Sequence, residues 1–122
     1  MSSMPLHIVV VDDEPEIVSL VSETLEMDDF IVTSFTCPMQ ALNSLGDLEF
    51  NVIISDAHMP GMTGMEFLAK TKESIERPFF FFLCTGDMSI DTEKFESLGG
   101  TKIISKPFSI IELGETIRST CL

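Results

Sequence analysis

The stretch LHIVVVDDEP, residues 6–15, joins a mostly apolar, β-branched run to three consecutive acids and a proline. The apolar half is typical of a strand that helices cover on both faces, and the proline suits the first turn of a helix. Carboxylates this close repel one another and raise one another's pKa unless a cation lies between them. The stretch therefore predicts a buried strand that ends beside a cation, followed directly by a helix.

Four more strand-sized apolar runs follow along the chain, with amphipathic stretches between and after them. The predicted strands are 6–11, 30–35, 51–55, 78–84 and 101–105, and the predicted helices are about 14–27, 37–45, 64–75, 89–98 and 109 onward. The first, third and fourth runs are nearly all apolar, as the middle strands of a parallel sheet should be. Five alternations of strand and helix predict an α/β fold with a doubly wound parallel sheet.

Two of the predicted helices show a clear apolar side. Ile17, Val21 and Leu25 recur four residues apart in the first, with Val18 beside them. Met65, Leu68 and Ala69 share one side of the third. The phenylalanines at 79–82 are interpreted as a core strand rather than a binding stripe.

Composition limits the classes of function. The chain has 122 residues, 44% of them apolar, which suits one domain over residues 1–122, and no output segment is expected within it. Its net charge of −13 argues against direct binding of nucleic acid and favours a cation or a basic protein surface. Three cysteines without C-x-x-C spacing indicate neither a disulfide framework nor a zinc site. Without a signal peptide or membrane-spanning run, a cytoplasmic protein with no membrane partner is expected.

Polar residues stand where four of the predicted strands end. Asp12, Asp13 and Glu14 follow the first strand, and Asp56 follows the third. Ligands of doubly wound folds collect at the carboxyl ends of the strands, so these carboxylates should converge at one edge of the sheet. Three aspartates around one point form a hard oxygen site, which suits Mg²⁺ better than an all-protein calcium cage.

The other two strand ends carry residues that suit an anion. Thr85 follows the fourth strand, and Lys106, followed by Pro107, follows the fifth. A hydroxyl and an ammonium group beside a bound cation would hold a phosphoryl group and stabilise its charge during transfer. Asp56, at the centre of the sheet, is then the natural nucleophile, and the product would be an acyl phosphate.

Four stretches together carry a resemblance to a known family. They are VVVDDEP, IISDAHMPGMTGMEFL, FFFFLCTG and IISKPFS. In their order and spacing they resemble the receiver domains of response regulators in two-component signalling, chemotaxis regulators among them, over essentially the whole chain. The resemblance implies a flavodoxin-like sheet of five parallel strands in the order 2-1-3-4-5, flanked by five helices.

The resemblance also implies a role for each site residue. Phosphorylation falls on Asp56, direct metal ligation on Asp13 and Asp56, and a water-mediated metal contact on Asp12. The backbone carbonyl of His58 completes the protein ligands for Mg²⁺, with Mn²⁺ as a substitute. Thr85 becomes the switch hydroxyl and Lys106 the cation that pairs with the phosphoryl group, and the Lys106–Pro107 bond is expected to be cis.

The implied function is a signalling switch rather than an independent enzyme. A histidine kinase or histidine phosphotransfer protein would donate the phosphoryl group from a phosphohistidine, and the receiver would catalyse only its own phosphotransfer and slow autodephosphorylation. A target protein would bind the face made by the fourth helix, the fifth strand and the fifth helix, where Ile103, Ile110 and Ile111 offer apolar surface. A weak homodimer is a further expectation.

Three alternatives stay open at the level of sequence. A haloacid-dehalogenase-like aspartyl-phosphate phosphatase also groups Asp, Thr, Lys and Mg²⁺, but its D-x-D-x-[TV] signature does not occur after either acidic strand end. A flavodoxin-like cofactor module needs amide donors after the first strand, where acids stand instead. The third alternative is a receiver that is not phosphorylated.

The chain departs from the usual receiver pattern at a few positions. Ile103 stands where an aromatic switch residue is common, and Gly86 and Gly100 replace frequent alanines. His58 and Asp87, each two residues past a key site residue, are hypothesised to tune the lifetime of the acyl phosphate.

Overall fold

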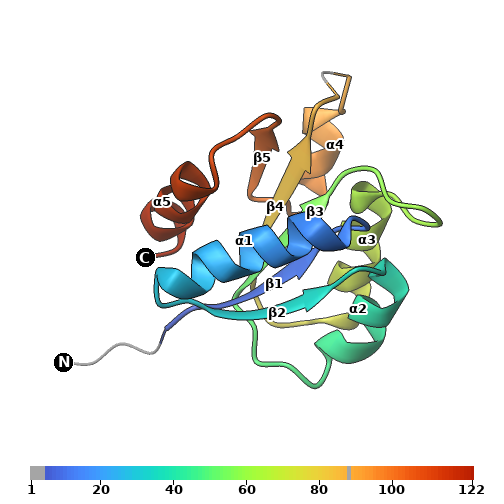
Figure 1. Ribbon diagram of the computed structural model, residues 1–122. Helices are drawn as coiled ribbons and strands as arrows, with labels where there is room; N and C mark the ends of the chain where they lie inside the picture. Colours follow the sequence, from blue (N-terminus) through green and yellow to red (C-terminus); the bar gives the residue numbers. More distant parts are fainter. Residues whose placement is uncertain (1–4, 88) are drawn as a thin grey trace.

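Strands and helices alternate through the described part of the chain, between His7 and Cys121. A computed structural model describes residues 5–87 and 89–122. The order of elements is β1 (His7–Val11), α1 (Pro15–Met27), β2 (Ile31–Phe35), α2 (Pro38–Leu45), β3 (Val52–Asp56), α3 (Gly64–Ser74), β4 (Phe80–Thr85), α4 (Thr92–Ser97), β5 (Lys102–Ser105) and α5 (Ile110–Cys121) (Figure 1). All neighbouring strands are parallel, in the order β2-β1-β3-β4-β5. The predicted fold class and strand order are confirmed.

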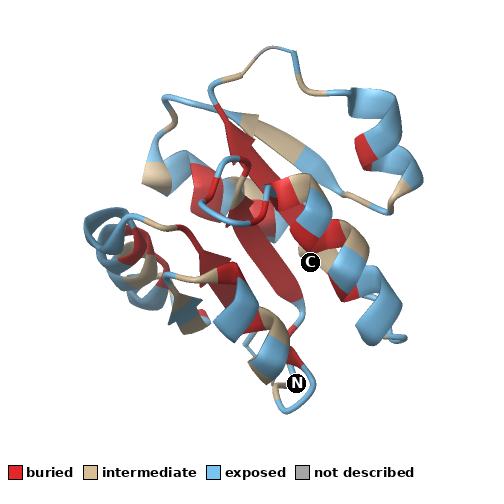
Figure 2. Ribbon diagram, turned by 90° about the vertical axis from the view of Figure 1, so that its right-hand side faces the viewer, coloured by how far each residue is buried: buried red, intermediate tan, exposed pale blue. Residues whose placement is uncertain are grey.

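The sheet separates two hydrophobic cores. One core packs α2, α3 and α4 against the sheet, and the other packs α1 and α5 against the opposite face. Successive residues of a strand point to opposite faces, so Phe81 enters the first core and Phe82 the second, and both are fully buried. β1, β3 and β4 are buried along most of their length, whereas β2 and β5 at the edges are not (Figure 2). The phenylalanine run is therefore core strand, as predicted.

Two strands run one residue further than predicted. Asp56 is the last residue of β3 because it still pairs with Cys84, and Thr85 is the last residue of β4 because it pairs with Ser105. The helix predicted at 89–98 begins only at Thr92, since the side chain of Asp91 caps its first turn by accepting a hydrogen bond from the Lys94 N–H. These shifts leave the site residues at the same edge of the sheet.

The buried faces of two helices differ from prediction. In α1 the buried residues are Val18, Val21 and Leu25, while Ile17 is 38% exposed. In α3 the buried side chains centre on Phe67 and Leu68, and Met65 is only half-buried. The prediction for α1 therefore holds except at Ile17, and that for α3 holds only at Leu68, because apolar residues also lie on the flank of the core-facing stripe.

The helix starts set the direction of the chain as it leaves the site edge. Pro15 opens α1 at a position that needs no N–H donor. Thr63 and Glu66 form a reciprocal capping box at the start of α3. Among the described residues, no helix combines the length and apolar character that a bilayer-spanning segment requires.

Candidate functional site

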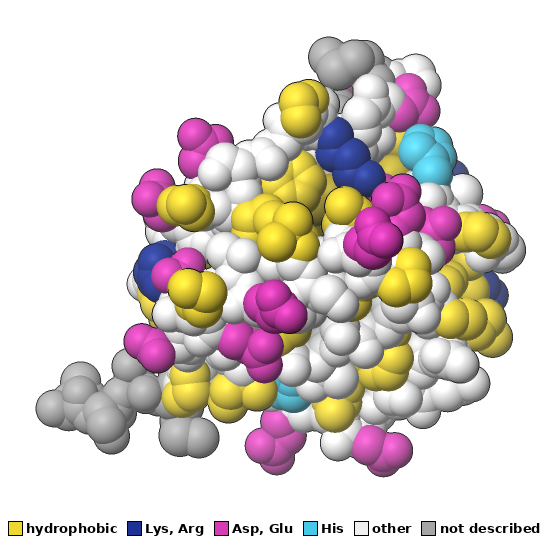
Figure 3. Space-filling model, in the orientation of Figure 1, with side chains coloured by type: hydrophobic (Ala, Val, Ile, Leu, Met, Phe, Trp, Pro, Cys, Tyr) yellow, Lys and Arg dark blue, Asp and Glu magenta, His cyan; other side chains and the backbone are white. Residues whose placement is uncertain are grey.

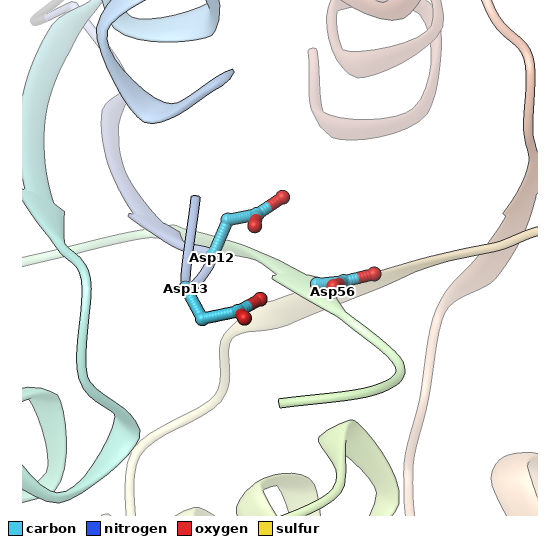
Figure 4. A group of neighbouring side chains, drawn as sticks. All are labelled: Asp12, Asp13 and Asp56. Atoms are coloured by element: carbon cyan, nitrogen blue, oxygen red, sulfur yellow. The ribbon is translucent and has the colours of Figure 1, made fainter. Parts of the chain in front are cut away.

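Three aspartates meet where β1 and β3 end. Each of Asp12, Asp13 and Asp56 offers a carboxylate oxygen, and these oxygens lie within 4.8 Å of one another (Figure 4). β1 and β3 are hydrogen-bonded neighbours with Val11 opposite Ser55, so the residues that follow Val11 and Ser55 must lie side by side. The predicted convergence of the three carboxylates is found.

Lys106 joins the cluster from the far side of β4. Its Nζ lies 2.8 Å from Oδ1 of Asp56 and donates a hydrogen bond to it. The N–H of Lys106 also bonds to the carbonyl of Thr85, which holds the start of the loop after β5 against the end of β4. The Lys106–Pro107 peptide bond is cis, as expected.

The backbone around Asp56 is tightly packed. Oδ1 of Asp56 accepts a hydrogen bond from the N–H of Ala57, and the carbonyl of Ala57 accepts one from Gly64. A Cβ at Gly64 would lie 2.5 Å from the carbonyl oxygen of Asp56, so only glycine lets α3 begin so close to β3. Gly61 (φ 83°) supplies the left-handed turn of this loop. These two glycines therefore shape the turn of the stretch MPGMTG before α3.

Burial perturbs the acid of the cluster that lies deepest. Asp12 is 8% exposed, and this desolvation raises its pKa to about 6. A hydrogen bond from the Glu14 N–H works against that rise, and the charge of Asp56 adds to it. Loss of hydration therefore raises the pKa of Asp12 more than repulsion by the neighbouring carboxylates does, although the sequence-based prediction relied on that repulsion.

Two neighbours of the aspartates also have shifted pKa values. Burial would lower the pKa of Lys106, but its hydrogen bond with Asp56 and the charges of Asp56 and Asp12 raise the pKa overall. Burial raises the pKa of the Cys84 thiol to about 12. Lys106 is therefore a persistent cation, and Cys84 stays a neutral thiol.

Thr85 and the two residues proposed to tune the site are linked to one another. The Thr85 hydroxyl is buried and accepts a hydrogen bond from the N–H of Asp87 at 2.9 Å. Oδ2 of Asp87 lies 3.4 Å from Nε2 of His58, and both side chains are more than a third exposed. The imidazole of His58 thus faces Asp87 rather than the three aspartates.

The donor set fits a small hard cation. Three carboxylates and few other protein ligands leave room for water, which Mg²⁺ tends to keep. A cation among the carboxylates would remove their mutual repulsion, and a lysine beside them would bind an anion held next to that cation. The site can therefore place a phosphoryl group between a metal ion and an ammonium group.

Comparison with known proteins agrees with this chemistry. Residues 8–118 match a family model described as the response regulator receiver domain. The chain is 33% identical over 108 residues to the response regulator SaeR of Staphylococcus epidermidis, covering 88% of this chain and 46% of SaeR. It is 32% identical over 115 residues to the transcriptional regulatory protein FixJ of Bradyrhizobium diazoefficiens, covering 93% of this chain and 55% of FixJ. The chain spans about half the length of these relatives.

A solved structure extends the likeness to the whole fold. The chemotaxis protein CheY4 of Vibrio cholerae superposes with a TM-score of 0.87 and 28% sequence identity. The match covers 96% of this chain and 99% of CheY4. Fold and site together define a receiver-type signalling domain, and the chain belongs to the response regulator receiver domain family. The phosphatase, flavin-module and unphosphorylated-receiver alternatives are not favoured.

Sequence reasoning missed two features near the site. One is the close approach of α3, which makes Gly64 necessary and which the G-M-T-G spacing hinted at. The other is a cavity beside the aspartates, toward which Ile17 turns instead of entering the core. The apolar residues assigned to a target-binding face also separate: Ile103 packs against one core and Ile110 against the other, and only Ile111 is exposed.

Proposed function

We propose that Asp56 is the phosphorylated residue and that this chain accepts its phosphoryl group from a phosphohistidine in a Mg²⁺-dependent reaction. The observation that carries the proposal is the ion pair between Lys106 and Asp56 at the edge of the three-aspartate cluster. Asp13 and Asp56 would bind Mg²⁺ directly, together with the backbone carbonyl of His58, and Asp12 would do so through water. Mn²⁺ could replace Mg²⁺, because both prefer oxygen ligands.

Each residue then has a defined task in the transfer. An oxygen of the Asp56 carboxylate attacks phosphorus, the P–N bond to the donor imidazole breaks, and the imidazole keeps the electron pair. Lys106 exchanges its hydrogen bond with Asp56 for one with a phosphoryl oxygen, and the Thr85 hydroxyl donates to another. When bound, Mg²⁺ supplies positive charge beside the transferring phosphoryl group.

A histidine kinase or histidine phosphotransfer protein is the proposed donor. A downstream protein would then bind the α4-β5-α5 face, and weak self-association could occur there too. Of the three isoleucines predicted for this face only Ile111 is exposed, so it would supply most of their apolar contact with the partner. The chain would catalyse only its own phosphotransfer and slow autodephosphorylation.

Intact mass measurement tests the assignment. After incubation with acetyl phosphate and Mg²⁺, the wild-type chain should gain the mass of one phosphoryl group, and Asp56→Asn should gain none. Asp47→Asn, the same change at an exposed loop residue, is the matched control and should behave as wild type. A phosphoryl group on Asp56→Asn, or none on the wild type, would refute the assignment.

A further inference from the structure

A mostly apolar cavity of about 480 Å³ opens between α1 and α5. Its floor consists of Val10, Ile54 and Cys84 from three adjacent strands, and Leu20 and Phe108 form parts of its walls. Figure 3 shows apolar side chains gathered in a hollow between these helices, next to a basic side chain and a group of acids. Cavities of this size with few polar groups are typical of small-molecule sites.

The walls leave apolar surface for a ligand to cover. Leu20 is 52% exposed and Ile17 38% exposed, although both side chains border the cavity. The floor residues are almost fully buried, so an occupant would be enclosed by the sheet below and by α1 and the start of α5 at the sides. Removing this apolar surface from water would stabilise an apolar occupant.

The polar end of the cavity is acidic. Asp12, Glu14 and Asp56 line it together with Lys106, and Lys106 is already paired with Asp56. The carboxylate of Asp12 is nearly buried, and among the described residues its only hydrogen bond comes from the Glu14 N–H. A buried carboxylate without a cation is unfavourable, and the net charge of −13 draws cations toward it.

We propose that this cavity binds a small amphipathic cation, with its ammonium or similar head beside Asp12 and its apolar body over Val10, Ile54 and Cys84. Binding of this cation does not require phosphorylation of Asp56. It is therefore a further property of the chain, beyond the proposed phosphotransfer. Because the head would lie next to the three aspartates, such a ligand would weaken Mg²⁺ binding and thereby phosphorylation. By linkage, Mg²⁺ would weaken the binding of the ligand by the same factor.

Three probes that share one chain length test the charge preference. The ¹⁵N-labelled protein is titrated without Mg²⁺ with n-octylammonium, n-octanol and n-octanoate below their micelle concentrations, and amide shifts are followed by NMR. Octylammonium should bind at least about tenfold more tightly than octanoate, a difference of about 1.4 kcal/mol, and should shift the amides of Val10, Ile54 and Cys84. Equal affinities, tighter binding of octanoate, or shifts confined to other regions would overturn the proposal.

Two matched pairs of variants locate the binding. Leu20→Gln should weaken octylammonium binding several-fold, while Met39→Gln, which changes an equally exposed residue of α2, should not. Cys84→Met should block the floor, whereas Cys37→Met lies outside the cavity. Leu20 is exposed enough for its variant to fold even if Cys84→Met does not. Unchanged binding in Leu20→Gln would overturn the location.

Discussion

The Nζ atom of Lys106 lies 2.8 Å from Oδ1 of Asp56, although fifty positions separate the two residues in the sequence. The Asp56 side chain is 10% exposed, so this ammonium group supplies much of the charge compensation that water cannot. A phosphoryl group on Asp56 would require the same ammonium group. The ion pair of the resting molecule therefore keeps Lys106 in position for the proposed transfer.

Replacing Lys106 by methionine keeps the length of the side chain and removes its charge. We expect phosphorylation of Asp56 by acetyl phosphate to slow on the order of 10²-fold, because a preorganised donor for the developing charge is lost. The rate is measured by quenched-flow mass spectrometry. Lys102→Met, at an exposed position of β5, is the control and should leave the rate unchanged. A normal rate in Lys106→Met would contradict the proposed role.

Asp13→Ala tests the metal site separately from the fold. Asp13 is half-buried and belongs to neither hydrophobic core. Without Mg²⁺, the free energy of unfolding of Asp13→Ala should therefore differ from that of the wild type by no more than about 0.5 kcal/mol. Binding of Mg²⁺, measured by calorimetry, and phosphorylation of Asp56 should both be lost. Asp47→Ala, in an exposed loop, should retain both. Phosphorylation at the normal rate in Asp13→Ala would remove this residue from the proposed ligand set.

The position of the site could be predicted because it depends on the strand topology more than on how individual side chains pack. Once strands are parallel, residues that follow them share an edge, so Asp12, Asp56 and Lys106 could be placed together from strand positions alone. The order of the strands came from the family resemblance, because apolar runs alone do not determine which strands are neighbours in the sheet. The cavity was not predictable, because it depends on Ile17 turning out of the core-facing stripe of α1.

Gly100 illustrates a detail that only packing explains. The sequence departs here from the alanine common in receivers, and a Cβ at this position would overlap the ring of Phe95, which is 2% exposed. We expect Gly100→Ala to lower the free energy of unfolding by about 1–3 kcal/mol, as overpacking of a core does. Urea denaturation followed by circular dichroism measures this change, because the chain has no Trp or Tyr for fluorescence.

A double-mutant cycle and a matched glycine complete that test. The penalty of Gly100→Ala should shrink when Phe95 is already leucine, because the smaller side chain leaves space for the methyl group. Gly46→Ala adds its Cβ where no atom lies within 4 Å and should not destabilise. An equal penalty in both backgrounds would show that the Phe95 ring is not the cause.

Asp12 gives the stability of the metal-free protein a specific pH dependence. Its pKa of about 6 exceeds the ordinary value of 3.8, so the native state favours the protonated form. This contribution to stability is complete below about pH 4 and is lost as the pH rises through 6. Asp12→Asn cannot ionise and should therefore be more stable than wild type at pH 7, by at most about 3 kcal/mol, and within about 0.5 kcal/mol of it at pH 4.

The comparison isolates Asp12 from other acids. The pKa values of Glu66 and Asp87 are lowered, by hydrogen bonds from Thr63 and Ser89 respectively, but both acids are present in wild type and variant and cancel in the difference. Urea denaturation in metal-free buffer at the two pH values measures the effect. A stability difference that is the same at pH 4 and pH 7 would rule out ionisation of Asp12 as its source.

The contact between His58 and Asp87 joins the loops that follow β3 and β4, on either side of the proposed phosphorylation site. Nε2 and Oδ2 lie 3.4 Å apart, and the N–H of Asp87 also holds the Thr85 hydroxyl. A bridge here would restrict the approach of water to an acyl phosphate on Asp56.

We therefore expect the double variant His58→Ala, Asp87→Ala to dephosphorylate several-fold faster than wild type, as loss of ³²P from the isolated phosphoprotein would measure. The same double change at His7 and Asp47, which lie outside these two loops, is the control for general destabilisation. An unaltered rate of loss in the His58, Asp87 variant would end the hypothesis that this pair tunes the lifetime of the phosphorylated state.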